Sequence, residues 1–230
     1  MIFHQAKYSL YAPWIILSIW MGMLFNNIFL KKNHIEKRYR LFFILMISLY
    51  SIVGGIILNA IIHRTSSIGL TSYGGVIGII LGAFLFGKME PKNSGIYFKS
   101  AILSLPLIYS ISKLACFFSG CCYGIPYHGF FSITYTYELN IPLLPIQLIE
   151  TIVFMLLFFI CLWMQKNLYI IEITIILSAI AKGILDFGRY DHLKHVITIN
   201  QIISIIFVII GVSIILKRKF KNRRIREYDM

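Results

Sequence analysis

Seven apolar stretches occupy most of this 230-residue chain, and each is long enough to cross a lipid bilayer as a helix. Charged residues make up only 13% of the sequence, about half the share of a typical soluble domain, which excludes a soluble globular enzyme. The sequence predicts an all-α integral membrane protein with one polytopic domain at 1–216 and a basic tail at 217–230. The stretches lie at residues 9–30, 41–62, 68–87, 100–121, 143–164, 169–188 and 198–216.

The basic residues are distributed unevenly between the two sets of connections, which predicts the orientation of the chain. The formal net charge is +13, from 22 Lys and Arg against 9 Asp and Glu. Most of the basic residues lie on one side, at 31–40, 88–99, 165–168 and in the tail after residue 216. Because cytoplasmic connections carry the excess of Lys and Arg, we expect the N-terminus outside and the C-terminus in the cytoplasm.

The basic tail also indicates which kind of partner the chain contacts. Lys217–Arg226 is dominated by Lys and Arg, which suits a segment held at an anionic cytoplasmic leaflet. No aromatic or groove-reading pattern accompanies it, so we expect membrane lipids and no nucleic acid as partners.

Polar and ionisable residues collect in the outer halves of five of the predicted spans. Ionisable groups at this depth cost a few kcal/mol and normally face a partner or a cavity. We therefore expect a polar pocket open to the outer leaflet; the alternative is an ion-paired stripe at 182, 186 and 189 that only orients helices. The residues concerned are Tyr73, Gly74 and Gly75, then Lys113, then Gln147 and Glu150, then Lys182, Asp186 and Arg189, and finally Gln201.

The segment at 112–126 is the most distinctive stretch of the sequence. Gly120 and Gly124 permit a positive φ or a close backbone approach, and Pro126 cannot continue a helix. We expect the fourth span to end here and to leave backbone N–H groups for an anion or a carbonyl oxygen.

Three cysteines, Cys116, Cys121 and Cys122, lie in this segment. Their C-x4-C-C spacing lacks the paired C-x-x-C of a zinc site, and no base is placed beside Cys121 by the sequence. We interpret them as small packing residues and predict neither a metal site nor a cofactor. A disulfide, a metal and a nucleophilic Cys121 stay open as alternatives.

The loop at 122–142 is rich in aromatic residues and contains no Lys or Arg. Aromatic side chains are enriched at the membrane–water interface. Two interpretations follow, an interfacial anchor or a lid over a lipid substrate.

Five segments in this order resemble the motifs of the bacterial prolipoprotein diacylglyceryl transferases. The resemblance covers roughly residues 66–205. The segments are S-Y-G-G-V-I-G at 72–78, the cysteine–glycine stretch at 113–126, P-I-Q-L-I-E at 145–150, K-G-I-L-D-F-G-R at 182–189 and N-Q-I-I-S at 200–204.

The resemblance implies a multi-pass enzyme of the bacterial plasma membrane. Such an enzyme moves the diacylglyceryl group of phosphatidylglycerol to the cysteine of a prolipoprotein signal peptide, without a cofactor. The implied phosphate-binding groups are Arg189, Lys182, Lys113 and backbone N–H groups near Gly74, Gly75, Gly120 and Gly124. The implied base comes from Tyr73, Asp186 or Glu150, and the implied substrate contacts include Gln147 and Gln201.

The sequence departs from the family motifs at several of these positions. Tyr73 stands where the family has a histidine, Lys113 where it has an arginine, and Cys116 and Cys121 where it has asparagine and glutamate. Lys182 and Asp186 replace an arginine and a glutamate. Lysine lacks the planar guanidinium fork, and the missing histidine removes a base that titrates near neutrality.

These departures leave two alternatives to the family reaction. One is a related transferase with another acceptor, and the other is a non-catalytic, lipid-binding member of the fold. A transporter is disfavoured, because the polar residues stop halfway across the predicted membrane.

Overall fold

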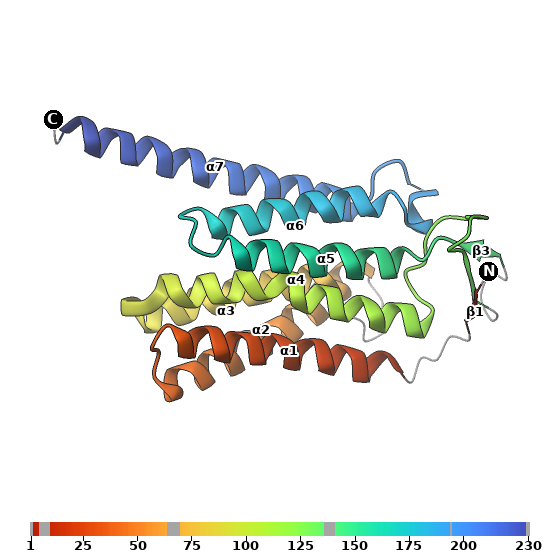
Figure 1. Cartoon of the computed structure of the whole chain (residues 1–230), viewed down its shortest axis with the longest axis horizontal. Helices are drawn as coiled ribbons and strands as arrows, with labels where there is room; N and C mark the ends of the chain where they lie inside the picture. The colour runs from red at the N-terminus through yellow and green to blue at the C-terminus, as the bar shows by residue number, and fades with distance from the viewer. Residues whose placement is uncertain (1, 5–9, 64–69, 136–140, 194, 229–230) are drawn as a thin grey trace. The chain divides into compact units, whose positions relative to one another are not determined.

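A computed structural model of the protein describes residues 2–4, 10–63, 70–135, 141–193 and 195–228. Seven α-helices account for most of these residues, which confirms the all-α prediction (Figure 1). They are α1 (Tyr11–Lys32), α2 (Lys37–His63), α3 (Ser72–Met89), α4 (Ser94–Ser119), α5 (Ile146–Trp163), α6 (Ile170–Asp186) and α7 (Ile199–Tyr228).

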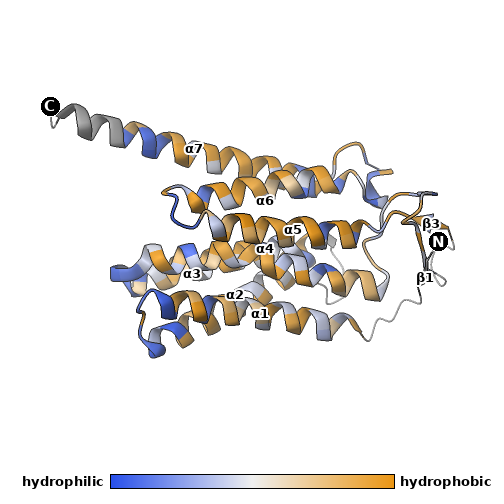
Figure 2. Ribbon diagram, viewed as in Figure 1, coloured by the Kyte–Doolittle hydropathy of each residue, from blue (hydrophilic) through white to orange (hydrophobic). Residues whose placement is uncertain are grey.

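Six of these helices are long and apolar enough to cross a membrane, and α6 is shorter, with 17 residues. Apolar residues cover the middle of α5, α6 and α7, whereas hydrophilic residues gather at helix ends and in connections (Figure 2). The chain is therefore a multi-pass membrane protein, as its apolar stretches predict. Which end of each helix faces outward stays a prediction from the distribution of Lys and Arg.

Helix α7 is longer than the span predicted at 198–216. It continues as one 30-residue helix through the basic segment to Tyr228. Lys and Arg are good helix formers, so the change from apolar to basic residues alters the surface of the helix but does not end it. The boundary between a membrane domain and a tail stays a prediction.

The chain forms two compact units. The continuous unit consists of residues 15–109, and the discontinuous unit consists of residues 1–14 and 110–230. Each is described below by itself.

The continuous unit is held together by aromatic packing and by a close approach of α2 and α3. Phe43, Phe86 and Tyr97 are buried, and their ring centroids lie 4.7–5.2 Å apart. A Cβ atom at Gly74 would contact the backbone oxygen of Gly54 on α2. Small residues allow such close contact between helices in a membrane, so the crossing accounts for glycine here.

In the discontinuous unit, α5, α6 and α7 pack in sequence order, with the end of α4 in the same unit. A small sheet lies at the end of the unit where α5 and α7 begin (Figure 1). Strand β1 (Ile2–His4) pairs in parallel with β2 (Ile133–Tyr135), which pairs antiparallel with β3 (Pro142–Leu143). The connections at this end position the candidate site.

Candidate functional site

A fully buried carboxylate, Glu150 of α5, binds three cations from separate elements. Its Oε2 lies 3.1 Å from Nζ of Lys113 on α4, and its Oε1 lies 2.9 Å from Nζ of Lys182 on α6. Arg189, just after α6, donates from one terminal nitrogen to both oxygens, at 2.9 and 3.0 Å. The prediction that these ionisable groups converge is confirmed.

A second carboxylate, Asp186 at the end of α6, extends this network to the start of α7. Its Oδ1 lies 3.5 Å from Nε of Arg189 and accepts a hydrogen bond of 3.1 Å from Nδ2 of Asn200. Its Oδ2 accepts a short hydrogen bond from the hydroxyl of Thr198. We call Lys113, Glu150, Lys182, Asp186 and Arg189 the Glu150 network.

The Glu150 network gathers three cations around one carboxylate. All five of its side chains are buried. Burying charge is costly unless it is paired, so cations gathered at this depth suit the approach of an anion. Two members of the predicted stripe at 182, 186 and 189 pair with Glu150 of α5; whether the stripe only orients helices stays open.

Arg189 is held in place by its backbone. It forms an isolated β-bridge with Gly124, flanked by hydrogen bonds of 3.0 Å from Ile125 N to Gly188 O and from Tyr190 N to Tyr123 O. A Cβ atom at Gly124 would contact the backbone oxygens of Leu144 and Gly188. Gly124 therefore permits the close approach that fixes Arg189, and a direct contact of Gly124 with substrate stays a prediction.

The end of α4 is a Schellman motif, in which a left-handed residue stops the helix. Gly120 has a φ of 69°, its N–H donates to the carbonyl of Phe117, and the N–H of Cys121 donates to the carbonyl of Cys116. These two bonds satisfy the last helix carbonyls. The helix ends where the glycines predict, but both N–H groups are used within the chain; anion binding near Gly120 stays a prediction.

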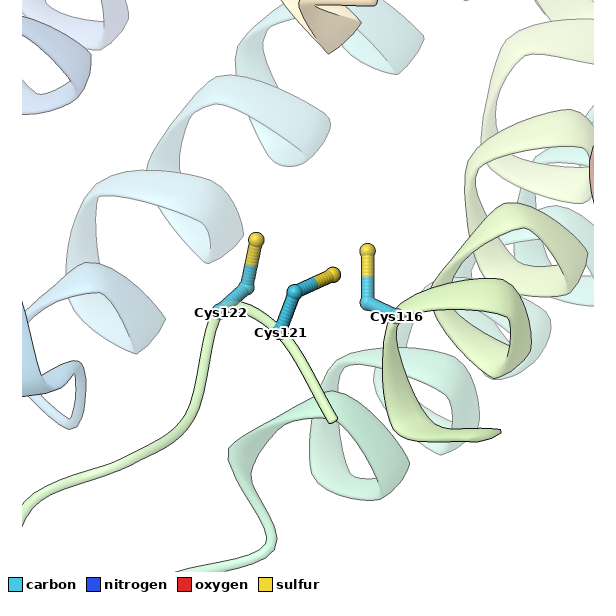
Figure 3. A group of neighbouring side chains, drawn as sticks. All are labelled: Cys116, Cys121 and Cys122. Atoms are coloured by element: carbon cyan, nitrogen blue, oxygen red, sulfur yellow. The ribbon is translucent and has the colours of Figure 1, made fainter. Parts of the chain in front are cut away.

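This turn brings three cysteines together. Residues two positions after and three positions before such a helix end normally touch, and here they are Cys121 and Cys116. Cys122 also has a positive φ, of 56°. Its sulfur lies beside those of Cys116 and Cys121, and the three Sγ atoms lie within 4.8 Å of one another (Figure 3). All three are free thiols. The C-x4-C-C spacing alone does not indicate this cluster.

One thiolate is favoured within the cysteine cluster. Hydrogen bonds from the thiols of Cys116 and Cys121, and then the charges of Lys113 and Arg189, hold the pKa of Cys122 well below its usual range. Lys113 of the Glu150 network precedes Cys116 by three residues on α4, so the cysteine cluster adjoins this network.

Two glutamines predicted to contact substrate are buried beside these groups. Nε2 of Gln147 donates to the carbonyl of Cys121 at 2.8 Å and to the hydroxyl of Tyr135 at 3.3 Å. Oε1 of Gln147 and Nε2 of Gln201 have no hydrogen-bond partner among the described residues. Buried polar atoms are normally paired, so both are available to a polar ligand.

Sequence reasoning missed the role of Thr198. Its Oγ1 accepts from the N–H of Gln201 at 3.2 Å, and Oε1 of Gln201 accepts from the N–H of Thr198 at 3.0 Å. This is a capping box at the start of α7, and the pattern T-I-N-Q at 198–201 could have revealed it. The cap orients the hydroxyl that reaches Asp186.

The aromatic loop divides into a buried part and an exposed part. Tyr135 is buried against Tyr123, whereas the side chains of Phe130 and Phe131 are exposed and contact each other at 5.1 Å between centroids. Tyr137 lies outside the described residues. The exposed pair suits contact with an apolar phase; anchor and lid both stay predictions.

The three remaining predicted residues, Tyr73, Gly74 and Gly75, belong to the continuous unit at the start of α3. The N–H of Gly75 donates to the carbonyl of Thr71 at 3.1 Å. Their proposed contacts with substrate stay predictions.

Comparison with known proteins identifies a family whose model matches the chain. The family model for prolipoprotein diacylglyceryl transferase matches residues 1–217. The chain is similar to the phosphatidylglycerol–prolipoprotein diacylglyceryl transferase of Clostridium tetani, at 24% identity over 88% of this chain and 92% of that protein. It is also similar to the enzyme of the same name from Dehalococcoides mccartyi, at 26% identity over 41% of this chain and 36% of that protein.

Proposed function

Since the chain belongs to the prolipoprotein diacylglyceryl transferase family, we propose that it transfers the diacylglyceryl group of phosphatidylglycerol to the lipobox cysteine of a prolipoprotein signal peptide. Bacterial lipoprotein biogenesis in the plasma membrane is the corresponding process. The family match and the two named relatives support this assignment.

The convergence of three cations at Glu150 is the observation that carries the proposal. Phosphatidylglycerol has one negative charge at its phosphate, which such cations can bind. Arg189 and Lys182 approach Glu150 from the end of α6, and Lys113 approaches from α4. A guanidinium can bind two phosphate oxygens at once, so Arg189 is the principal phosphate ligand in this proposal.

The reaction develops negative charge that these cations can offset. The sulfur of the acceptor forms a bond to the terminal glyceryl carbon of the lipid, and the bond from that carbon to the phosphate oxygen breaks. Glycerol phosphate leaves with the electron pair and gains one negative charge. Preorganised cations in a site with little water stabilise such charge effectively.

Glu150 and Asp186 serve in this proposal as positioning residues. Both oxygens of each carboxylate are already engaged, by three cations at Glu150 and by Thr198, Asn200 and Arg189 at Asp186. A carboxylate so engaged fixes its cations and has little capacity left to accept the proton of a thiol. Tyr73, which the family resemblance also implies as a base, belongs to the other unit, and its role stays a prediction.

The site is proposed to open toward the outer leaflet. Within the discontinuous unit, the Glu150 network lies where α4 and α6 end and where α7 begins. The basic segment lies at the other end of α7 (Figure 1). If the basic segment faces the cytoplasm, the network lies on the extracytoplasmic side. The exposed Phe130 and Phe131 then suit the headgroup region.

A direct assay tests this function. The purified chain is mixed with phosphatidylglycerol labelled in its acyl chains and a lipobox peptide, and the peptide is analysed by mass. We expect a mass increase of one diacylglyceryl group on the cysteine peptide and none on the same peptide with serine. A chain that binds the lipid but modifies neither peptide is the non-catalytic alternative.

A further inference from the structure

The cysteine cluster is a second chemical site, separate in composition from the Glu150 network. It contains three sulfur ligands from two adjoining segments, the last turn of α4 and the turn after it. Their spread of at most 4.8 Å exceeds the separation in a tetrahedral zinc site, about 3.8 Å for a Zn–S bond of about 2.3 Å, by only about 1 Å. Small side-chain rotations suffice to close the three sulfurs on one ion.

From this geometry we propose that Cys116, Cys121 and Cys122 bind a zinc ion as thiolates and leave its fourth coordination position to an incoming thiol. Three protein ligands with one open position are typical of catalytic zinc sites, whereas structural sites have four. Among the described residues, no other histidine, cysteine or carboxylate completes the group. This inference departs from the packing role and the absence of metal expected from the spacing.

The surroundings of the cysteine cluster suit such an ion. Zinc with three thiolates has a net charge of −1, which suits a position beside cations such as Lys113. The hydroxyl of Ser119 donates to the carbonyl of Ala115 at 2.7 Å and lies 3.3 Å from the sulfur of Cys121; turned from that carbonyl, it could donate to a Cys121 thiolate. Hydrogen bonds of this kind orient metal ligands and adjust their basicity.

Access to the site is asymmetric. Cys116 is buried, Cys121 is partly buried and Cys122 is exposed. A ligand therefore approaches from the side of Cys122, while the other two sulfurs hold the ion against the end of α4. The positive φ at Gly120 and Cys122 fixes this arrangement.

The identity of the incoming thiol rests on the proposed function, in which it is the thiol of the lipobox cysteine. On binding zinc, this thiol releases its proton to water and becomes a thiolate. The sulfur then forms the C–S bond as the C–O bond to phosphate breaks, and glycerol phosphate leaves with the electron pair. No oxidant or reductant is needed, and the site supplies the deprotonation that the engaged carboxylates do not.

Metal analysis of the purified full chain tests the ion. We expect one zinc ion per chain in the wild type and in Cys161→Ser, which alters a buried free cysteine of α5 outside the cluster. We expect Cys121→Ser and Cys122→Ser to lose the ion while inserting into the membrane at the abundance of the control. A metal-free wild type, an unchanged zinc content in both cluster variants, or a disulfide within the cluster overturns the proposal.

Cobalt replacement of zinc in the wild type tests the open position without relying on variants. We expect sulfur-to-cobalt charge-transfer bands, and a shift of the visible bands when the lipobox peptide is added. The same peptide with serine should leave the spectrum unchanged. Absence of the charge-transfer bands, or of a shift with the cysteine peptide, contradicts the inference.

The transfer assay separates this inference from the proposed function. Zinc and thiol binding without transfer would remove the function and leave the metal site. Transfer at the wild-type rate by Cys122→Ser would leave the function and remove the role of zinc. We expect transfer to fall at least about 100-fold in Cys122→Ser, a loss of about 2.7 kcal/mol in transition-state stabilisation.

Discussion

Two buried glutamates of the discontinuous unit differ sharply in their surroundings. Glu150 is fully buried and binds three cations from separate elements. Glu172, near the start of α6, pairs among the described residues with Arg218 of α7 at 2.6 Å, and the side chain of Arg218 is 40% exposed. We interpret this partly solvated pair as structural. Glu150 instead gathers three buried cations, which suits the binding of an anion.

Replacing one arginine in each region should produce the largest difference in transfer rate. Arg189→Gln removes the proposed phosphate ligand, and we expect transfer to fall by about 10²–10³-fold. Arg218→Gln should leave the rate within about threefold, a difference of under 1 kcal/mol. Rates with labelled phosphatidylglycerol and a lipobox peptide measure both.

Abundance in the membrane is the control for the two arginine variants. Both should insert into the membrane at wild-type abundance. Equal rates for Arg189→Gln and Arg218→Gln would mean that Arg189 has no specific role in transfer.

Neutralising each glutamate tests the difference in burial. Glu150→Gln leaves three buried cations without their shared counter-charge, and we expect a loss of about 3–5 kcal/mol in the free energy of unfolding. Glu172→Gln should cost about 1 kcal/mol or less, because Arg218 is partly solvated. Thermal unfolding in detergent compares the two, and similar costs would contradict the contrast between the regions.

Removing the hydroxyl of Thr198 should have a smaller effect. Thr198→Val deletes the helix cap of α7 and the hydrogen bond to Asp186, and we expect a loss of about 2 kcal/mol. Thr174→Val is a matched change in α6, where the hydroxyl donates to the carbonyl of Ile170 in its own helix. That variant should lose less than about 1 kcal/mol. Equal melting temperatures for the two would show that the cap is unimportant.

Two glycines at opposite ends of α4 sharpen the comparison further. Gly120→Ala places a side chain on a residue with φ of 69°, and we expect a loss of about 1 kcal/mol together with weaker zinc binding. Gly95→Ala meets no atom within 4 Å and should stabilise the helix slightly. Zinc titration and thermal unfolding measure both effects. Unchanged zinc affinity in Gly120→Ala would separate the cysteine cluster from the helix end.

The sequence was sufficient to predict the seven helices and the convergence of the charged groups. Apolar length indicates each span, and charged residues at a common depth must find one another, so the sequence alone places Lys113, Glu150 and Arg189 together. Their pairing pattern could not be predicted. That Glu150 binds all three cations depends on how α4, α5 and α6 face one another, which hydropathy does not report.

The cysteine cluster shows a different limit. Cys121 and Cys122 follow Cys116 by five and six residues. The left-handed backbone at Gly120 and Cys122 brings the three sulfurs together. Glycine made this conformation available at the first position, but nothing in the sequence required it at Cys122. Thr198 was predictable in principle from its capping pattern, and only its contact with Asp186 needed the fold.

Complementation is the most direct test of the claim that the Glu150 network serves diacylglyceryl transfer. The chain is expressed in a bacterial cell depleted of its own prolipoprotein-modifying enzyme, and lipidation of a reporter prolipoprotein is measured by mass. The wild type should restore the lipid-modified reporter, and Arg189→Gln at equal membrane abundance should not. Restoration by Arg189→Gln, or no restoration by the wild type, would contradict the account.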